Sequence, residues 1–86
     1  MLHARSDYNR IQDPAGLIAE DEPVFLLRAK DIYAPEAIEF WAEMVEEDEP
    51  ELSKSVMNFA NFMREWQNKN GCKKPNVPND KQWSEK

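Results

Sequence analysis

The residues best suited to bind a ligand are two cations beside an apolar run in an otherwise acidic region. Arg28 and Lys30 follow the run at residues 24–27 and are the only basic residues in positions 13–51, which hold 13 acidic residues. A cation among apolar side chains needs a partner that offsets the loss of water. That partner is either a carboxylate of the protein or an anionic ligand, and the sequence leaves both alternatives open.

Tyr8 and Arg10, in the N-terminal arm, add groups that suit the same kind of ligand. An aromatic ring stacks on a nucleobase, whereas guanidinium and ammonium groups bind phosphate oxygens. We therefore expect Tyr8, Arg10, Arg28 and Lys30 to bind a small anionic, nucleotide-like molecule. The alternative is that Arg28 and Lys30 form salt bridges only with the protein's own carboxylates.

Residues for catalysis or for a metal centre are nearly absent from the sequence. His3 is the only histidine and Cys72 the only cysteine, so the usual metal-ligand clusters and histidine-assisted nucleophiles are missing. Residues 46–49 are acidic but lack the spacing of a calcium loop. The two glycines, Gly16 and Gly71, do not form a phosphate-binding loop. We expect a protein that is not an enzyme, with no catalytic residue, no metal site and no cofactor.

The charge of the chain is unevenly distributed. The 86 residues carry a net charge of −6, composed of +1 in residues 1–12, −11 in residues 13–51 and +4 in residues 52–86. This balance argues against direct non-specific binding of nucleic acid, which needs a basic surface. It favours either contacts between copies of the chain, acidic middle to basic end, or docking of the acidic middle on a basic partner.

The size of the chain favours assembly with a second subunit, because a short chain buries only a small core. We expect one domain over residues 1–75 and a flexible tail over residues 76–86. Several apolar residues lie outside the apolar faces that we expect the helices to bury in the core, and they would serve a subunit interface. We therefore expect a homo-oligomer, with these residues at its interface: Leu27, Phe40, Met57 and Phe62.

The composition indicates a cytoplasmic protein with no membrane partner. The first ten residues are polar, and the longest apolar run, residues 24–27, is far shorter than the roughly 20 residues of a spanning helix. A single cysteine suits a reducing compartment.

Residues 21–33 are compatible with two structures. Residues 24–27 would suit a buried strand, but the sequence shows no second strand to pair with it. Asp21 would instead cap a helix that ends before Pro35 and carries apolar side chains on one face. We expect the helix.

The apolar spacing further along predicts two longer helices. One covers residues 35–47. The other begins after Asp48, which would form a capping box with Glu51, and ends at Gly71. Helices joined by so short a connection pack as an antiparallel hairpin. The predicted fold is all-α, with an irregular N-terminal arm that turns at residues 13–16, a short helix, the hairpin and a C-terminal tail.

Parts of the chain resemble small helical proteins of phages and prophages. The resemblance covers residues 8–75 and is carried by Tyr8-Asn9-Arg10, the segment 20–31, Ala34-Pro35 and Phe40-Trp41. It implies a protein of the host-cell cytoplasm that counters host defences. Some proteins of similar size and character are helical oligomers that sequester cyclic nucleotide immune signals between subunits.

The leading hypothesis is therefore a non-enzymatic, phage-type anti-defence protein that binds a nucleotide-like signal at a subunit interface. The alternative is an acidic protein–protein inhibitor or adaptor that docks on a basic host surface. It would use the acidic residues of the helix over 35–47: Glu36, Glu39, Glu43, Glu46 and Glu47.

Overall fold

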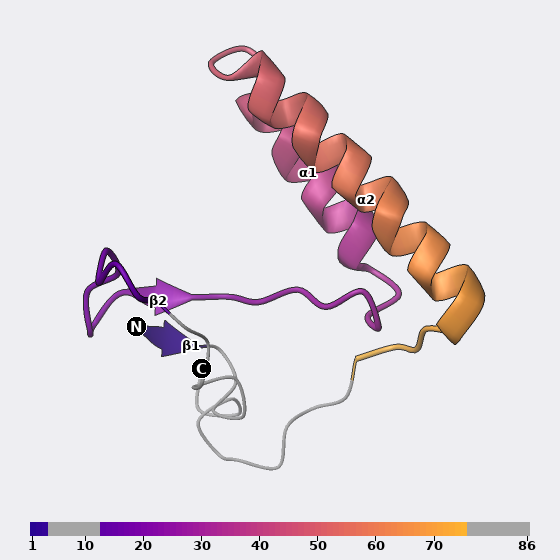
Figure 1. The fold of residues 1–86 in the computed structure, drawn as a ribbon, viewed down its shortest axis with the longest axis horizontal. Helices are drawn as coiled ribbons and strands as arrows, with labels where there is room; N and C mark the ends of the chain where they lie inside the picture. Colours follow the sequence, from indigo (N-terminus) through magenta and orange to yellow (C-terminus); the bar gives the residue numbers. More distant parts are fainter. Residues whose placement is uncertain (4–12, 76–86) are drawn as a thin grey trace. The chain divides into compact units, whose positions relative to one another are not determined.

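The computed structural model describes residues 1–3 and 13–75 (Figure 1). These residues fall into two compact units: the helical unit, Leu27–Pro75, and a smaller unit that contains the described part of Met1–Leu26. The division lies inside the predicted domain of residues 1–75, and the predicted tail lies outside the described residues. The protein is mostly helical with little strand, as expected. Its elements are β1 (Leu2–His3), β2 (Pro23–Val24), α1 (Ala34–Val45) and α2 (Pro50–Asn70).

The prediction of a helix over residues 21–33 is wrong. Pro23 and Val24 form β2, which pairs in parallel with β1 in the register Leu2 with Pro23 and His3 with Val24. The amide of Leu2 donates to the carbonyl of Glu22 at 2.7 Å. The sequence showed no partner for this strand, but β1 at the start of the chain pairs with it. β1 has only two residues, which is too short to show a period in the sequence.

The turn predicted in the smaller unit is confirmed. The amide of Gly16 donates to the carbonyl of Asp13 at 3.0 Å, and Gly16 has a φ of 63°, a value that glycine adopts without strain. The carboxylate of Asp13 accepts hydrogen bonds from the amides of Leu17 and Ile18.

The two longer helices form close to their predicted positions. Each has a proline at its start, Pro35 in α1 and Pro50 in α2, where the missing N–H costs nothing. α2 ends at Gly71, whose positive φ of 82° suits glycine. The predicted capping box is wrong, because Glu49 occupies the N-cap and no side chain caps the helix there.

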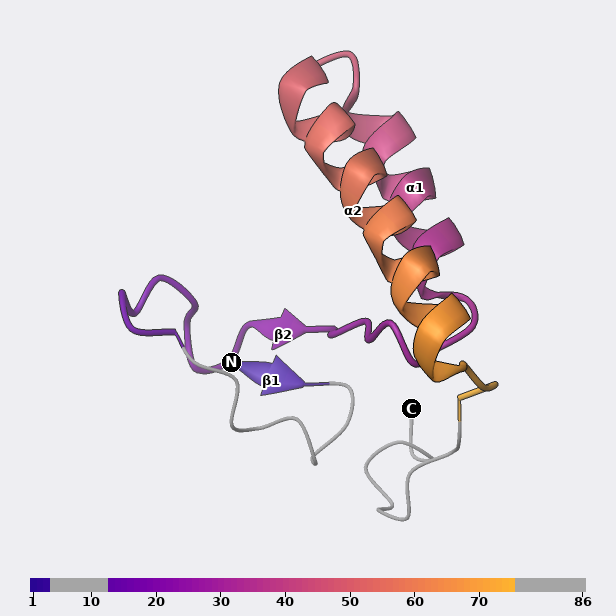
Figure 2. The same ribbon diagram turned by 45° about the vertical axis from the view of Figure 1, so that its right-hand side comes forward.

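α1 and α2 lie side by side and contact each other along their length (Figures 1 and 2). The contact is made mainly by small residues, since Ala34, Ala42 and Ala60 are fully buried. Ser53 is also buried, and its hydroxyl donates to the carbonyl of Ala42 at 2.7 Å. Met63 is the one large side chain among the buried apolar residues of the described chain. The core between the helices is therefore thin.

A glutamine holds the segment that precedes α1 against the end of α2. The Nε2 group of Gln67 donates to the carbonyls of Ala29, at 2.8 Å, and of Asp31, at 3.1 Å. The carboxylate of Asp31 accepts the amide of Tyr33 at 2.8 Å, which shapes the turn into α1. Residues 29–31 are thus held by the side chain of Gln67 and by main-chain hydrogen bonds to Lys73 rather than by helical hydrogen bonds.

Candidate functional site

The structure locates two of the four predicted ligand-binding residues. Tyr8 and Arg10 lie outside the described residues. Arg28 is exposed and Lys30 is half-buried, and both lie in the non-helical segment before α1. Their role in ligand binding stays a prediction.

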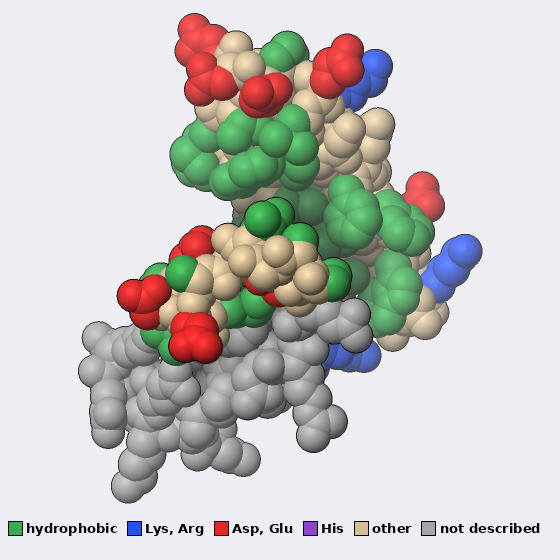
Figure 3. All heavy atoms as spheres, turned by 60° about the vertical axis from the view of Figure 1, so that its left-hand side comes forward, with side chains coloured by type: hydrophobic (Ala, Val, Ile, Leu, Met, Phe, Trp, Pro, Cys, Tyr) green, Lys and Arg blue, Asp and Glu red, His purple; other side chains and the backbone are tan. Residues whose placement is uncertain are grey.

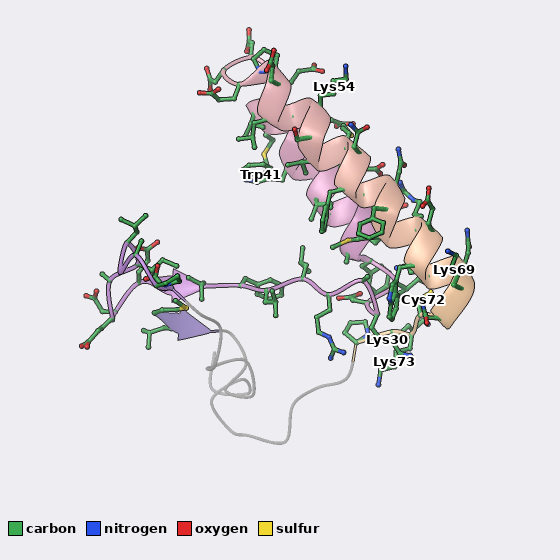
Figure 4. All side chains as sticks on the ribbon, viewed as in Figure 1. Lys30, Trp41, Lys54, Lys69, Cys72 and Lys73 are labelled. Carbon is green, nitrogen blue, oxygen red and sulfur yellow. The ribbon has the colours of Figure 1, made fainter. Side chains whose placement is uncertain are left out.

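Lys73, near the end of the helical unit, is the bridge partner of Asp31 and is hydrogen-bonded to the main chain of Lys30. The amide of Lys73 donates to the carbonyl of Lys30 at 2.9 Å, and the carbonyl of Lys73 accepts the amide of Ile32 at 3.0 Å. Residues 69–75 add two further lysines and contain no acidic residue. Figure 4 shows Lys30, Lys69 and Lys73 at this end of the unit. We call the group the cationic end: Arg28, Lys30, Lys69, Lys73 and Lys74. Asp31, the bridge partner of Lys73, is an acidic residue among them.

Sequence reasoning missed the part played by Lys73. Its neighbour Lys30 is reached through main-chain hydrogen bonds, and such bonds leave no pattern of side-chain types. The uneven charge was the available indication, since it placed an excess of cations after residue 52.

The opposite end of the helix pair, where α1 leads into α2, is acidic. Residues 43–51 include six acidic residues and no basic one, and Lys54 follows on the first turns of α2. The connection is tight, because the amides of Asp48 and Glu49 both donate to the carbonyl of Val45, at 3.1 and 2.7 Å. Acidic side chains gather at this end in Figure 3. We call the group the acidic end: Glu43, Glu46, Glu47, Asp48, Glu49 and Glu51.

An ion pair joins the two helices between these ends. Both guanidinium Nη atoms of Arg64 donate to the carboxylate of Glu39, at 2.6 Å each. These hydrogen bonds are the main reason that the pKa of Glu39 lies below its ordinary value and that the pKa of Arg64 is raised. Glu39 is one of the acidic residues assigned to an inhibitory surface, and here it already has a partner.

Large apolar side chains remain exposed on the helix pair, with exposed fractions from 38% to 64%. Figure 3 shows hydrophobic side chains gathered over both helices. The rings of Phe59 and Phe62 meet edge to face, with centroids 5.8 Å apart. We call this surface the apolar face: Phe40, Trp41, Met44, Leu52, Phe59, Phe62 and Trp66.

The central part of the apolar face lies on one side of the two helices, and the Glu39–Arg64 ion pair lies on the other side. Trp41 follows Glu39 by two positions and Trp66 follows Arg64 by two positions, which corresponds to about 200° around each helix. Both tryptophans therefore point away from the Glu39–Arg64 side. Leu52, Phe59 and Trp66 recur every seven residues, and Met44 follows Trp41 by three, so they extend the same stripes. Phe40 and Phe62 continue the surface around the outer sides of the helices.

The distribution of apolar residues differs from the predicted one. The apolar spacing of the two helices predicts that Trp41, Met44, Phe59 and Trp66 face the core, but these side chains are exposed. Of the residues predicted at a subunit interface, Leu27 and Met57 are half-buried and Phe40 and Phe62 are exposed, and the interface itself stays a prediction. The alanines and Ser53 bring the helices close together, which leaves the larger residues outside the contact.

Residues 1–3 and 13–75 contain no group of three or more histidine, cysteine or acidic residues placed to hold a metal ion. Neither of the two described helices combines the length and the apolar character that a membrane crossing requires. Comparisons with family models, with curated proteins and with solved structures find no match to this chain.

Proposed function

We propose that this chain is a non-enzymatic binding protein that assembles into a homo-oligomer through the apolar face. The exposure of seven large apolar side chains on the helix pair supports this proposal. From ordinary side-chain areas, they expose on the order of 600–800 Å². The part of this area on one side of the pair, without Phe40 and Phe62, is comparable to the roughly 300–600 Å² of the largest apolar patch on a typical monomer, a patch that is often functional.

The thin core gives the same proposal a second support. Two helices whose buried residues are three alanines, Ser53 and Met63 bury little apolar surface on their own. Two such pairs, each an antiparallel hairpin, would form a four-helix arrangement in which the aromatic side chains become the shared core. The large residues would then stabilise the assembly rather than the single chain.

A charge placed in the apolar face tests the proposal. Phe59→Glu should weaken self-association at least a hundredfold, because a carboxylate would be buried without a partner. Asn68→Glu is the matched control, since it adds the same charge at an exposed position about 180° around α2 from Phe59. Sedimentation velocity over a range of concentrations measures the association constant, and circular dichroism checks the helix content. A wild-type chain that stays monomeric at high micromolar concentration would overturn the proposal.

A second candidate function is the binding of a small anionic, nucleotide-like ligand at the cationic end, next to the subunit interface. The observation that favours it is the main-chain hydrogen bond between Lys73 and Lys30, which holds the two lysine-bearing segments together around Asp31. Arg28 and Lys30 would bind phosphates, with Arg10 assisting and Tyr8 stacking on a base. Because the ligand would be held without turnover, it should be recovered unchanged after release by heat.

Matched lysine variants separate this candidate from general charge effects. We expect Lys30→Ala and Lys73→Ala each to weaken binding of ATP or a cyclic dinucleotide by roughly ten- to a hundredfold, as for loss of a charge-assisted hydrogen bond. Lys54→Ala, at the other end of the helix pair, removes the same charge and should change little. Isothermal titration calorimetry measures the affinities. Equal losses in all three variants would reduce the effect to net charge and count against the site.

The biological role proposed for such a protein is that of a phage-type anti-defence protein, which sequesters a nucleotide immune signal in the host cytoplasm. The rival is an inhibitor that docks its acidic helix on a basic host surface. Reversal of Glu36, Glu43 and Glu46 to lysine distinguishes the two in an assay of host protection. Loss of protection with unchanged nucleotide affinity would favour the inhibitor.

A further inference from the structure

The opposite charges at the two ends of the helix pair determine how a second copy can lie on the apolar face. We propose that two copies pack antiparallel, so that the acidic end of each copy lies against the cationic end of the other. This inference rests on the proposed self-association and adds its direction and its polar contacts. The acidic end of each copy then offers carboxylates to the lysines at the cationic end of its partner.

The length of α2 and the placement of its apolar residues fit this arrangement. Its 21 residues, Pro50–Asn70, extend about 31 Å at 1.5 Å per residue. The exposed apolar residues of α2 are Leu52, Phe59, Phe62 and Trp66, and their mean position is close to Ala60. A two-fold axis at the level of Ala60 brings the connection before Pro50 of one copy to the level of the residues that follow Asn70 of the other, because each end of α2 lies ten residues from Ala60.

Electrostatics distinguishes this arrangement from the parallel one. With the copies parallel, six acidic residues face six acidic residues and the lysines of residues 69–75 face their own counterparts. With the copies antiparallel, each acidic end faces a cationic end. A single exposed ion pair contributes little, but like-charge contacts at both ends penalise the parallel dimer and a two-fold axis doubles the favourable contacts of the antiparallel one. The apolar face supplies affinity in either orientation, and charge selects between them.

Disulfide trapping in the full-length chain tests the orientation. Cys72 is exposed and lies at the cationic end, and it is the only native cysteine. Glu47→Cys places a second thiol at the acidic end. With diamide as the oxidant, this variant should form a covalent dimer between its new thiol and Cys72 of the second copy. The wild type, and Glu47→Cys combined with Cys72→Ser, should form none.

The other outcomes identify what has failed. A covalent dimer from the wild type or from the double variant would show the parallel arrangement and overturn the proposal. Sedimentation of the same samples before oxidation distinguishes failure of the orientation from failure of the self-association. If the Glu47→Cys variant is dimeric but does not cross-link, the antiparallel orientation is wrong. If all variants are monomeric, the self-association is wrong and the apolar face is covered within one chain. Added salt should weaken the antiparallel dimer, and a dimer that salt strengthens would also contradict it.

Discussion

Gln67 should decide whether residues 29–31, and with them Lys30, stay docked on α2. Its Nε2 group donates to the carbonyls of Ala29 and Asp31, at 2.8 and 3.1 Å. Gln67→Leu keeps a side chain of similar volume and removes both donors. Each hydrogen bond contributes about 0.5–1.5 kcal/mol, so the docked state should lose about 1–3 kcal/mol. This loss corresponds to a roughly five- to 150-fold larger population of the undocked segment.

Native-state hydrogen exchange measures this change where it occurs. The amides of Ile32 and Lys73 are the reporters, because they form the main-chain bonds between the docked segment and the residues after α2. Both should exchange faster in Gln67→Leu, while the amide of Ala60 in the middle of α2 should not. Asn68→Leu is the control, an amide-to-leucine change at the exposed neighbouring position. Equal exchange of the two reporters in both variants would refute the role given to Gln67.

Three further predictions concern the helix pair. Ser53→Ala should lower the free energy of unfolding by about 1 kcal/mol, because the buried hydroxyl donates to the carbonyl of Ala42 at 2.7 Å; in urea titrations the exposed Ser55→Ala should be close to wild type, and equal effects would contradict the assignment. Arg64→Met should destabilise the protein at neutral pH. Since the pKa of Glu39 is lowered from its ordinary value of 4.5, the contribution of the pair is present above that value and is lost as pH falls through the lower folded-state pKa. Wild type and variant should therefore converge in stability once the pH falls below the lowered pKa of Glu39, and a constant difference would argue against the pair. Pyrophosphate should shift the wild-type dimer toward monomer more than sodium chloride of equal ionic strength does, because it competes for the cationic end; equal shifts would mean screening alone.

The parts of the fold that the sequence predicts are those with local causes. Pro35 and Pro50 open helices because proline fits the first turn, and Gly71 ends α2 because glycine adopts a positive φ. β2 has a non-local cause, since its partner is the start of the chain. Helix and strand were both consistent with residues 21–33, and only the pairing with β1 distinguishes them.

The candidate surfaces were predictable only in part, for a similar reason. The spacing of apolar residues indicates that Trp41 and Trp66 belong to helices with an apolar side, but it does not show what covers that side. Ala42, Ala60 and Ser53 draw the helices so close that the tryptophans fall beside the contact. The charge distribution, by contrast, could be read directly, because the helix pair separates segments that are already acidic or basic along the chain.

Self-association and ligand binding would be coupled in the proposed dimer. The cationic end would serve two anionic partners, the acidic end of the second copy and a small ligand. If the acidic end of the second copy and the ligand bind the same lysines, dimerisation weakens ligand binding, and ligand binding weakens dimerisation by the same factor. A chain variant unable to dimerise would therefore bind the ligand more tightly. Phe59→Glu therefore gives a direct measure of the coupling: an affinity for ATP that rises as the dimer is lost places both partners on the cationic end, and an unchanged affinity places them on separate surfaces.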